Sequence, residues 1–150
     1  MKTYRHTPTL RVMNPLIARL IRLGLPMGPM ALLTVPGRKT GLPRTTPVAL
    51  APLDGGWRLV AAYGPVDWVK NLQSAGNAVI TVRGRETGVE SRQLEPGDAA
   101  PILRDSIAEA GPITRRVVGP YFDTDPKAPL SQWAEEARNH PVFHLTPRST

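Results

Sequence analysis

Two short glycine-containing turns, each lying between strand-like runs, constrain the fold of this chain most strongly. An Asp54-Gly55-Gly56 turn separates residues 48–53 from residues 57–62, and Gly84 separates two further runs. Asp-Gly and glycine-rich turns between such runs are typical of β-hairpins. A hairpin joins antiparallel strands, so we expect an antiparallel sheet in the first two thirds of the chain.

The remaining pattern adds helices between and after these hairpins. Because the helices are inserted among hairpins and do not alternate with single strands, the order favours an α+β fold: an antiparallel sheet or small barrel of about six strands, with helices packed outside. At 150 residues we expect one domain, 1–150. The predicted strands are 30–35, 48–53, 57–62, 77–83, 86–94 and 142–145, and the predicted helices are 68–75, 96–110 and 131–139.

Residues 1–25 form a distinct segment, which we expect to contain an amphipathic helix. Its apolar residues recur at the spacing of one helical face, and its arginines project elsewhere. Such a helix either covers one end of the core or lies weakly on an anionic membrane surface. The apolar positions are Met13, Leu16, Ile17 and Leu20.

Positive charge is concentrated at the start of the chain. Residues 1–60 hold nine of the 19 Lys and Arg residues and a single acid, Asp54, whereas the rest of the chain is close to neutral. A local positive field attracts an anionic cofactor, a lipid surface or nucleic acid. Only 5% of residues are aromatic, so stacking platforms for bases are scarce and we do not expect nucleic acid as a partner.

Composition also narrows the chemistry and the location. The chain has no cysteine, which excludes thiol catalysis, disulfides and thiolate metal sites and fits a reducing compartment. It shows neither a signal-peptide pattern nor an apolar run long enough to cross a bilayer. We therefore expect a cytoplasmic protein that touches a membrane at most peripherally, at the inner surface.

Residues 37–47, GRKTGLPRTTP, predict a tight turn with a cationic tip. Gly37 and Gly41 can adopt positive φ angles, which would let successive backbone N–H groups form an anion-binding nest. Arginine grips a pair of phosphate oxygens and lysine adds a mobile charge, so the tip suits a phosphorylated ligand. A solvated turn with exposed basic residues is the alternative interpretation.

The helix predicted over residues 68–75 carries a mixed face. Trp68, Asn71, Leu72 and Ala75 follow the i, i+3, i+4, i+7 spacing, which places an aromatic ring, an amide and aliphatic surface together. This face suits a planar polar ring, although Trp68 and Leu72 are equally well explained as core. A buried Asn71 would need hydrogen-bond partners, and a ligand could supply them.

Other reactive side chains indicate no further site. The three histidines, His6, His140 and His144, are scattered without carboxylates at ligand spacing, so we expect no metal site and place His144 at a strand edge. The neighbouring Glu135 and Glu136 are interpreted as solvated surface. No G-x-S-x-G nucleophile elbow is present.

The segments GRKTGLPRTTPV and GPVDWVKNLQSAGNAVITVRG, in this order, resemble the deazaflavin-dependent nitroreductase and F420H2-dependent quinone reductase family. The resemblance covers residues 30–84, and the ending HPVFHL is similar to the family's closing strand. It implies a split β-barrel related to the pyridoxamine-phosphate oxidase barrels. It also implies coenzyme F420 as cofactor, with FAD or FMN as the alternative.

The same resemblance assigns cofactor-binding residues. The basic turn would hold the phosphate of the deazaflavin tail with Arg38, Lys39, Thr40, Gly41 and Arg44. The next strand would begin beside the ring at Pro47 and Val48, and the strand end before the helix would line the ring through backbone groups of Ala61, Ala62, Tyr63 and Gly64. The W-x-x-N-L helix would approach the cofactor with Trp68, Asn71 and Leu72.

The activity implied is hydride transfer from reduced deazaflavin to an apolar, electron-poor acceptor such as a quinone, nitroaromatic or enone. Tyr121 and then Tyr63 are the candidates for a proton donor or substrate contact. The chain departs from the family pattern at Asp67 and Gly76, where relatives often carry proline, and it lacks a row of C-terminal tyrosines. A noncatalytic carrier of a flavin, fatty acid or other lipid is the alternative, and a homodimer is consistent with the barrel type.

Overall fold

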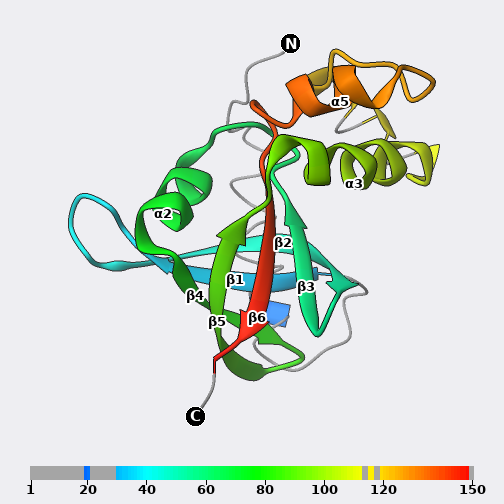
Figure 1. Ribbon diagram of the computed structural model, residues 1–150. Coiled ribbons are helices and arrows are strands. Elements are labelled where there is room, and N and C mark those ends of the chain that lie inside the picture. Colours follow the sequence, from blue (N-terminus) through cyan, green and yellow to red (C-terminus); the bar gives the residue numbers. More distant parts are fainter. Residues whose placement is uncertain (1–18, 21–29, 113–114, 117–118, 149–150) are drawn as a thin grey trace.

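The computed structural model describes residues 19–20, 30–112, 115–116 and 119–148 (Figure 1). Of the predicted N-terminal segment 1–25, only residues 19 and 20 are described, both helical, and the rest lies outside the described residues. The elements in chain order are β1 (Met30–Pro36), β2 (Pro43–Leu53), β3 (Gly56–Val60), α2 (Asp67–Ala75), β4 (Asn77–Val82), β5 (Arg85–Gln93), α3 (Pro96–Ala108), the 3-10 helix η1 (Gly119–Tyr121), α5 (Leu130–Glu136) and β6 (Val142–Pro147).

The six strands form a closed barrel in the order β1-β2-β3-β6-β5-β4. Every ladder is antiparallel, and the pairing of β1 with β4 closes the circle. The last strand, β6, inserts between β3 and β5, so the HPVFHL segment does complete the barrel. The predicted α+β split barrel with about six strands and external helices is confirmed.

Both predicted hairpin turns are present. Asp54 and Gly55 have φ angles of 36° and 78°, and Arg83 and Gly84 have φ angles of 51° and 77°. Two consecutive positive φ angles are the signature of the turn whose twist matches that of the flanking strands. The turns therefore fix the registers of β2 with β3 and of β4 with β5.

Strand β2 begins five residues earlier than the sequence indicated. Residues Pro43–Pro47 pair with Leu32–Pro36 of β1, so the basic turn is confined to residues 37–42 and the predicted turn over 37–47 is too long. Prolines 43 and 47 led to the error, because proline normally argues against a paired strand. The hydroxyls of Thr34 and Thr45 face each other across the ladder at 2.9 Å.

Gly56 lies where β3 approaches β6 too closely for any side chain. A Cβ atom built there would be 2.0 Å from the carbonyl oxygen of Leu145. We expect Gly56→Ala to destabilise the fold by about 1–3 kcal/mol, because the two strands must separate to accept the methyl group. Gly97→Ala, at a position open on all sides, should cause no loss in the same urea denaturation series, and equal stability of the two variants would contradict this packing.

Two hydrophobic clusters stabilise the molecule. The larger one fills the barrel and includes residues of α2, which packs against β1 and β4. The smaller one lies between α3, α5 and the adjoining ends of β3 and β6, where the two helices cross one end of the barrel (Figure 1). Val69 and Leu72 are the buried apolar residues of α2, and Leu103 and Trp133 are the largest in the second cluster.

Trp133 is fully buried between α3 and α5, yet its indole Nε1–H has no hydrogen-bond partner among the described residues. A buried indole N–H usually finds an acceptor, so this group contributes a desolvation penalty and no compensating bond. We therefore expect Trp133→Phe to change the free energy of unfolding by less than about 1 kcal/mol, since the smaller ring loses packing but also removes the penalty. A loss of several kcal/mol on thermal or urea unfolding would contradict this expectation and show that the lost packing outweighs the removed penalty.

Helix α2 begins differently from the prediction. It was expected over residues 68–75 and starts one residue earlier, at Asp67, and the preceding residue, Val66, makes no side-chain cap. The helix ends as expected at Gly76, whose φ of 71° lets its N–H bond to the carbonyl of Leu72. Among the described residues, no helix is long and apolar enough to cross a membrane.

Candidate functional site

The basic turn is held by its own backbone. The N–H of Gly37 donates to the carbonyl oxygen of Leu42, and the N–H of Gly41 donates to the carbonyl oxygen of Gly37. The amide of Leu42 donates to the hydroxyl oxygen of Thr40. Of these two glycines Gly41 has a positive φ, of 75°, whereas a Cβ atom at Gly37 would lie 3.2 Å from the carbonyl oxygen of Leu42, a tight contact that the turn would have to relax. These amides donate within the chain, as does that of Arg38, so they do not contribute N–H donors to the predicted nest.

The turn is docked onto helix α2 through Arg38. The Asn71 Oδ1 atom accepts from the backbone N–H of Arg38 at 3.1 Å and from its guanidinium Nη1 at 2.8 Å. The guanidinium also reaches the N-terminal end of the helix, 3.3 Å from Asp67 Oδ1 and 3.5 Å from the Asp67 carbonyl oxygen. Figure 1 shows the β1–β2 connection lying beside α2.

This docking supplies part of the hydrogen bonding that a buried Asn71 needs. Its side chain is 5% exposed, as predicted for a buried amide, but its carbonyl oxygen is satisfied by Arg38, a residue 33 positions away, and needs no ligand. Because Arg38 is also paired with Asp67, its charge is partly neutralised within the protein. Arg38 therefore acts first as the link between the turn and the helix.

Lys39 and Arg44 remain exposed on the turn and at the start of β2. They are the side chains of the turn best able to meet an anion, because lysine and arginine form charge-assisted hydrogen bonds with phosphate. Thr40 accepts from Leu42 through its oxygen, which leaves the hydroxyl hydrogen to donate. The turn and the start of β2 thus offer two exposed cations and a hydroxyl close to Arg38 in the sequence.

The predicted ring-facing positions divide into core and surface. Val48 and Leu72 belong to the barrel core, with 7% and 1% exposure, so they shape the wall from within. Trp68 is half-buried, packs against the same core and lies 6.2 Å from Phe143 between ring centroids. Pro47 is half-buried in β2. Trp68 is therefore an aromatic residue of α2 that combines an apolar surface with partial exposure.

The link between β3 and α2 brings the two candidate tyrosines together. The rings of Tyr63 and Tyr121 meet edge to face with centroids 5.1 Å apart. The amides of Ala61, Ala62 and Gly64 donate to carbonyls of the chain, so this segment is rigidly folded and does not offer those three donors to a ligand. Tyr63 and Tyr121 are both half-buried.

A buried polar cluster next to the tyrosines was missed by the sequence interpretation. Glu136 is 5% exposed and accepts from the Asp123 amide at 2.9 Å and the Thr124 hydroxyl at 3.1 Å, so its assignment to the solvated surface is wrong. His140 is fully buried and lies 3.7 Å from the same carboxylate. The i, i+4 spacing of Glu136 and His140 was the available signal.

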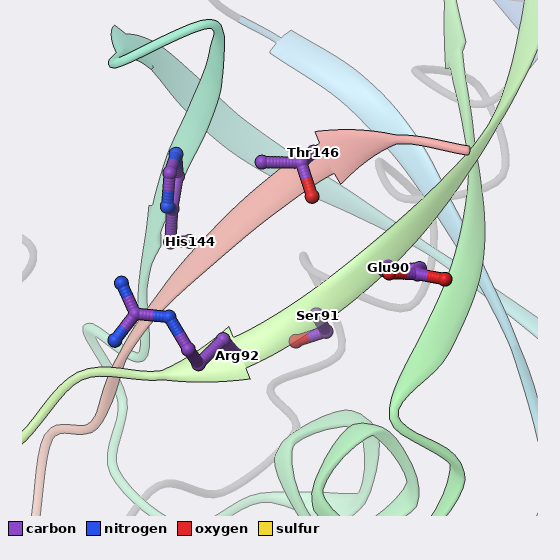
Figure 2. Close-up of a pocket in the computed structure, with 5 residues that line it drawn as sticks. All are labelled: Glu90, Ser91, Arg92, His144 and Thr146. Atoms are coloured by element: carbon purple, nitrogen blue, oxygen red, sulfur yellow. The ribbon is translucent and has the colours of Figure 1, made fainter. Parts of the chain in front are cut away.

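The outer face of the barrel carries a shallow polar hollow of about 190 Å³. Figure 2 shows its five lining side chains, which come from β5 and β6, and none of them is a predicted cofactor-binding residue. His144 lies in β6, which pairs with β3 on one side and β5 on the other, and its Nε2 atom lies 3.0 Å from the Leu53 carbonyl oxygen, so its placement at a strand edge is wrong. The hollow is lined by Glu90, Ser91, Arg92, His144 and Thr146.

No group of three or more metal-ligating side chains is found in the part of the chain that the structure describes. His6 lies outside the described residues.

The sequence matches a family model, F420H(2)-dependent quinone reductase, over residues 11–116. The chain belongs to the F420H2-dependent quinone reductase family. It is therefore an F420H2-dependent oxidoreductase, and its cofactor is coenzyme F420. The matched range contains the basic turn, α2 and Tyr63 but not Tyr121. No match is found among curated proteins.

Solved structures share the barrel of this reductase. An F420-H2 dependent reductase (FDR-A) is 19% identical with a TM-score of 0.50, and the match covers 78% of this chain and 93% of that one. A domain-swapped dimer is 18% identical (TM-score 0.52; 93% and 99% covered), and an FAD-binding protein from Mesorhizobium loti is 13% identical (TM-score 0.50; 89% of each chain). At these identities the likeness establishes the fold.

Proposed function

We propose that this reductase binds F420 between the docked basic turn and helix α2 and reduces an apolar, electron-poor acceptor such as a quinone, nitroaromatic or enone. The observation that carries the proposal is the double hydrogen bond from Arg38 to Asn71. It fixes a cationic turn beside the helix that bears Trp68, although the two segments are far apart in the sequence. A cofactor with a phosphorylated tail and a planar redox ring needs a cationic surface for the tail and an apolar surface for the ring.

The residues present fit the cofactor chemically. Lys39, Arg44 and the Thr40 hydroxyl are exposed donors suited to the anionic tail, and Arg38 is held in place between them and the helix. Trp68 offers an apolar face to a planar ring. The backbone of residues 61–64 is folded on itself, so it offers shape and carbonyl oxygens more than N–H donors.

When bound, the reduced deazaflavin supplies the hydride, and the protein supplies orientation and electrostatics. Lys39 and Arg44 bind and orient the charged tail, while Trp68 excludes water from one side of the pocket. The phenol of Tyr121, or that of Tyr63, whose ring contacts it, would donate a proton to an acceptor oxygen. The half-buried rings also provide apolar surface for the acceptor itself.

The decisive experiment follows F420 fluorescence while purified protein is added, and then the oxidation of reduced F420 with menadione, a nitroaromatic and cyclohexenone as acceptors. Saturable binding together with acceptor-dependent oxidation supports the proposal. Binding of F420 without turnover of any acceptor would favour a carrier.

A flavin carrier is the second candidate, because an FAD-binding protein shares the fold. FAD and FMN belong in the same titration, with palmitate as the fatty-acid probe. If one of these binds and F420 does not, the noncatalytic carrier of a flavin or lipid replaces the reductase.

We further propose a homodimer and a weak membrane-surface contact through residues 1–25. The dimer is supported by the domain-swapped dimer with the same fold, and the membrane contact by the basic, amphipathic pattern of the segment. Light scattering measures the first. For the second, flotation with anionic vesicles should separate the full chain from a chain lacking residues 1–25, and equal partition of both would contradict the contact.

A further inference from the structure

His140 bridges two parts of the proposed pocket with its two ring nitrogens. Its side chain is fully buried between α5 and β6. The Nδ1 atom lies 2.8 Å from the carbonyl oxygen of Ala61, and the Nε2 atom lies 2.7 Å from the carbonyl oxygen of Tyr121. These partners are 79 and 19 positions away, so the ring joins the end of β3 to η1.

Both partners are hydrogen-bond acceptors, which determines the number of protons on the ring. A backbone carbonyl oxygen cannot donate, so each nitrogen must carry an N–H to make its bond. A neutral imidazole has only one N–H and would leave a lone pair against a carbonyl oxygen. The geometry is satisfied only when His140 is the doubly protonated imidazolium.

The surroundings supply what a buried cation requires. Glu136 places Oε1 3.7 Å from Nε2, and its side chain is 6% exposed. Its two oxygens accept from the Asp123 amide and the Thr124 hydroxyl, as an ionised carboxylate does. The ring of Phe122 stacks on the imidazole with centroids 3.9 Å apart and an angle of 16°, which offers a π face to the charge.

We propose that His140 is a buried imidazolium, paired with Glu136, that acts as a positioning residue for the reductase by holding the Ala61–Gly64 wall and Tyr121 in a fixed relation. The bond to Ala61 fixes the segment that carries Tyr63, and the bond to Tyr121 fixes the second tyrosine. The rings of Tyr63 and Tyr121 meet edge to face between these two anchored segments. The positioning role rests on the proposed function, whereas the protonation state does not.

The protonation state is tested without cofactor, by ¹⁵N NMR of the histidine rings in the folded wild-type chain at pH 7. We expect both His140 nitrogens to show the shifts of protonated, N–H-bearing nitrogens. His144, which bonds through Nε2 alone, serves as the internal comparison. A single protonated nitrogen on His140 would overturn the imidazolium.

The positioning role is tested by kinetics. His140→Phe keeps a flat ring against Phe122 but removes both N–H groups, and we expect kcat with menadione to fall at least tenfold while the Kd for F420 changes less than threefold, because the basic turn is not touched. His140→Gln, which can keep one donor, should recover part of the loss. His144→Gln on the outer barrel face should leave kcat unchanged.

An unchanged kcat in folded His140→Phe would overturn the positioning role. If His140→Phe does not fold, the kcat of folded His140→Gln is used instead, and a wild-type kcat in that variant would overturn the positioning role. Failure of the wild-type chain to bind F420 would overturn the proposed function and the positioning role with it, and the NMR result would still decide the charge of His140 separately.

Discussion

Replacing Asn71 with leucine is expected to destabilise the protein by about 2–3 kcal/mol and to weaken F420 binding at least tenfold. The leucine fills a similar volume but removes the acceptor of two hydrogen bonds from Arg38, one of them charged. A neutral bond is worth about 1 kcal/mol and a charged one about 1.5–3 kcal/mol, and partial solvation of the guanidinium offsets part of the loss. Urea denaturation and fluorescence titration measure the two effects.

Asn71→Asp is the matched control. Aspartate keeps an oxygen in the same place and can accept from both the amide and the guanidinium of Arg38, so the turn should stay docked. We expect near wild-type stability for this variant. Wild-type F420 affinity in folded Asn71→Leu would show that the turn does not need the helix, and would contradict the proposed site.

The double variant Lys39→Ala/Arg44→Ala is expected to lower F420 affinity by about a hundredfold or more and to leave stability unchanged. Each cation that loses a charge-assisted hydrogen bond to the tail costs about 1.5–3 kcal/mol of binding, which is tenfold or more. Both side chains are exposed and their removal opens no cavity, so unfolding should occur at the same urea concentration.

Arg83→Ala/Arg85→Ala provides the control of equal charge. These arginines are exposed on the β4–β5 hairpin and lie outside the proposed site. If Lys39 and Arg44 contact the cofactor directly, only Lys39→Ala/Arg44→Ala should lose affinity for F420. The salt dependence of F420 binding should also be weaker in that variant. An equal loss in both double variants would instead indicate a general effect of net charge.

The hairpins were predictable because their determinants are local. The Asp54-Gly55 turn and the turn at Gly84 adopt positive φ angles that glycine tolerates, and the flanking runs follow strand propensities. The early start of β2 was not predictable in the same way, because Pro43 and Pro47 argue locally against a strand. Tertiary pairing with β1 overrides that preference.

The site shows the same division between local and long-range information. The basic turn and the Trp68–Asn71 spacing are visible in the sequence, and so is the need of a buried Asn71 for a partner. The identity of that partner is not, because Arg38 and Asn71 meet only after the barrel closes and α2 packs on it. The burial of Glu136 likewise depends on the amide and hydroxyl that residues 123 and 124 bring to it.

A crystal structure of the protein with F420 tests the central claim most directly. The account predicts that the cofactor phosphate lies within hydrogen-bond distance of Lys39 or Arg44, with the deazaflavin ring against the Trp68 side of α2. Density for the cofactor in the β5–β6 hollow, with the basic turn left in solvent, would contradict it.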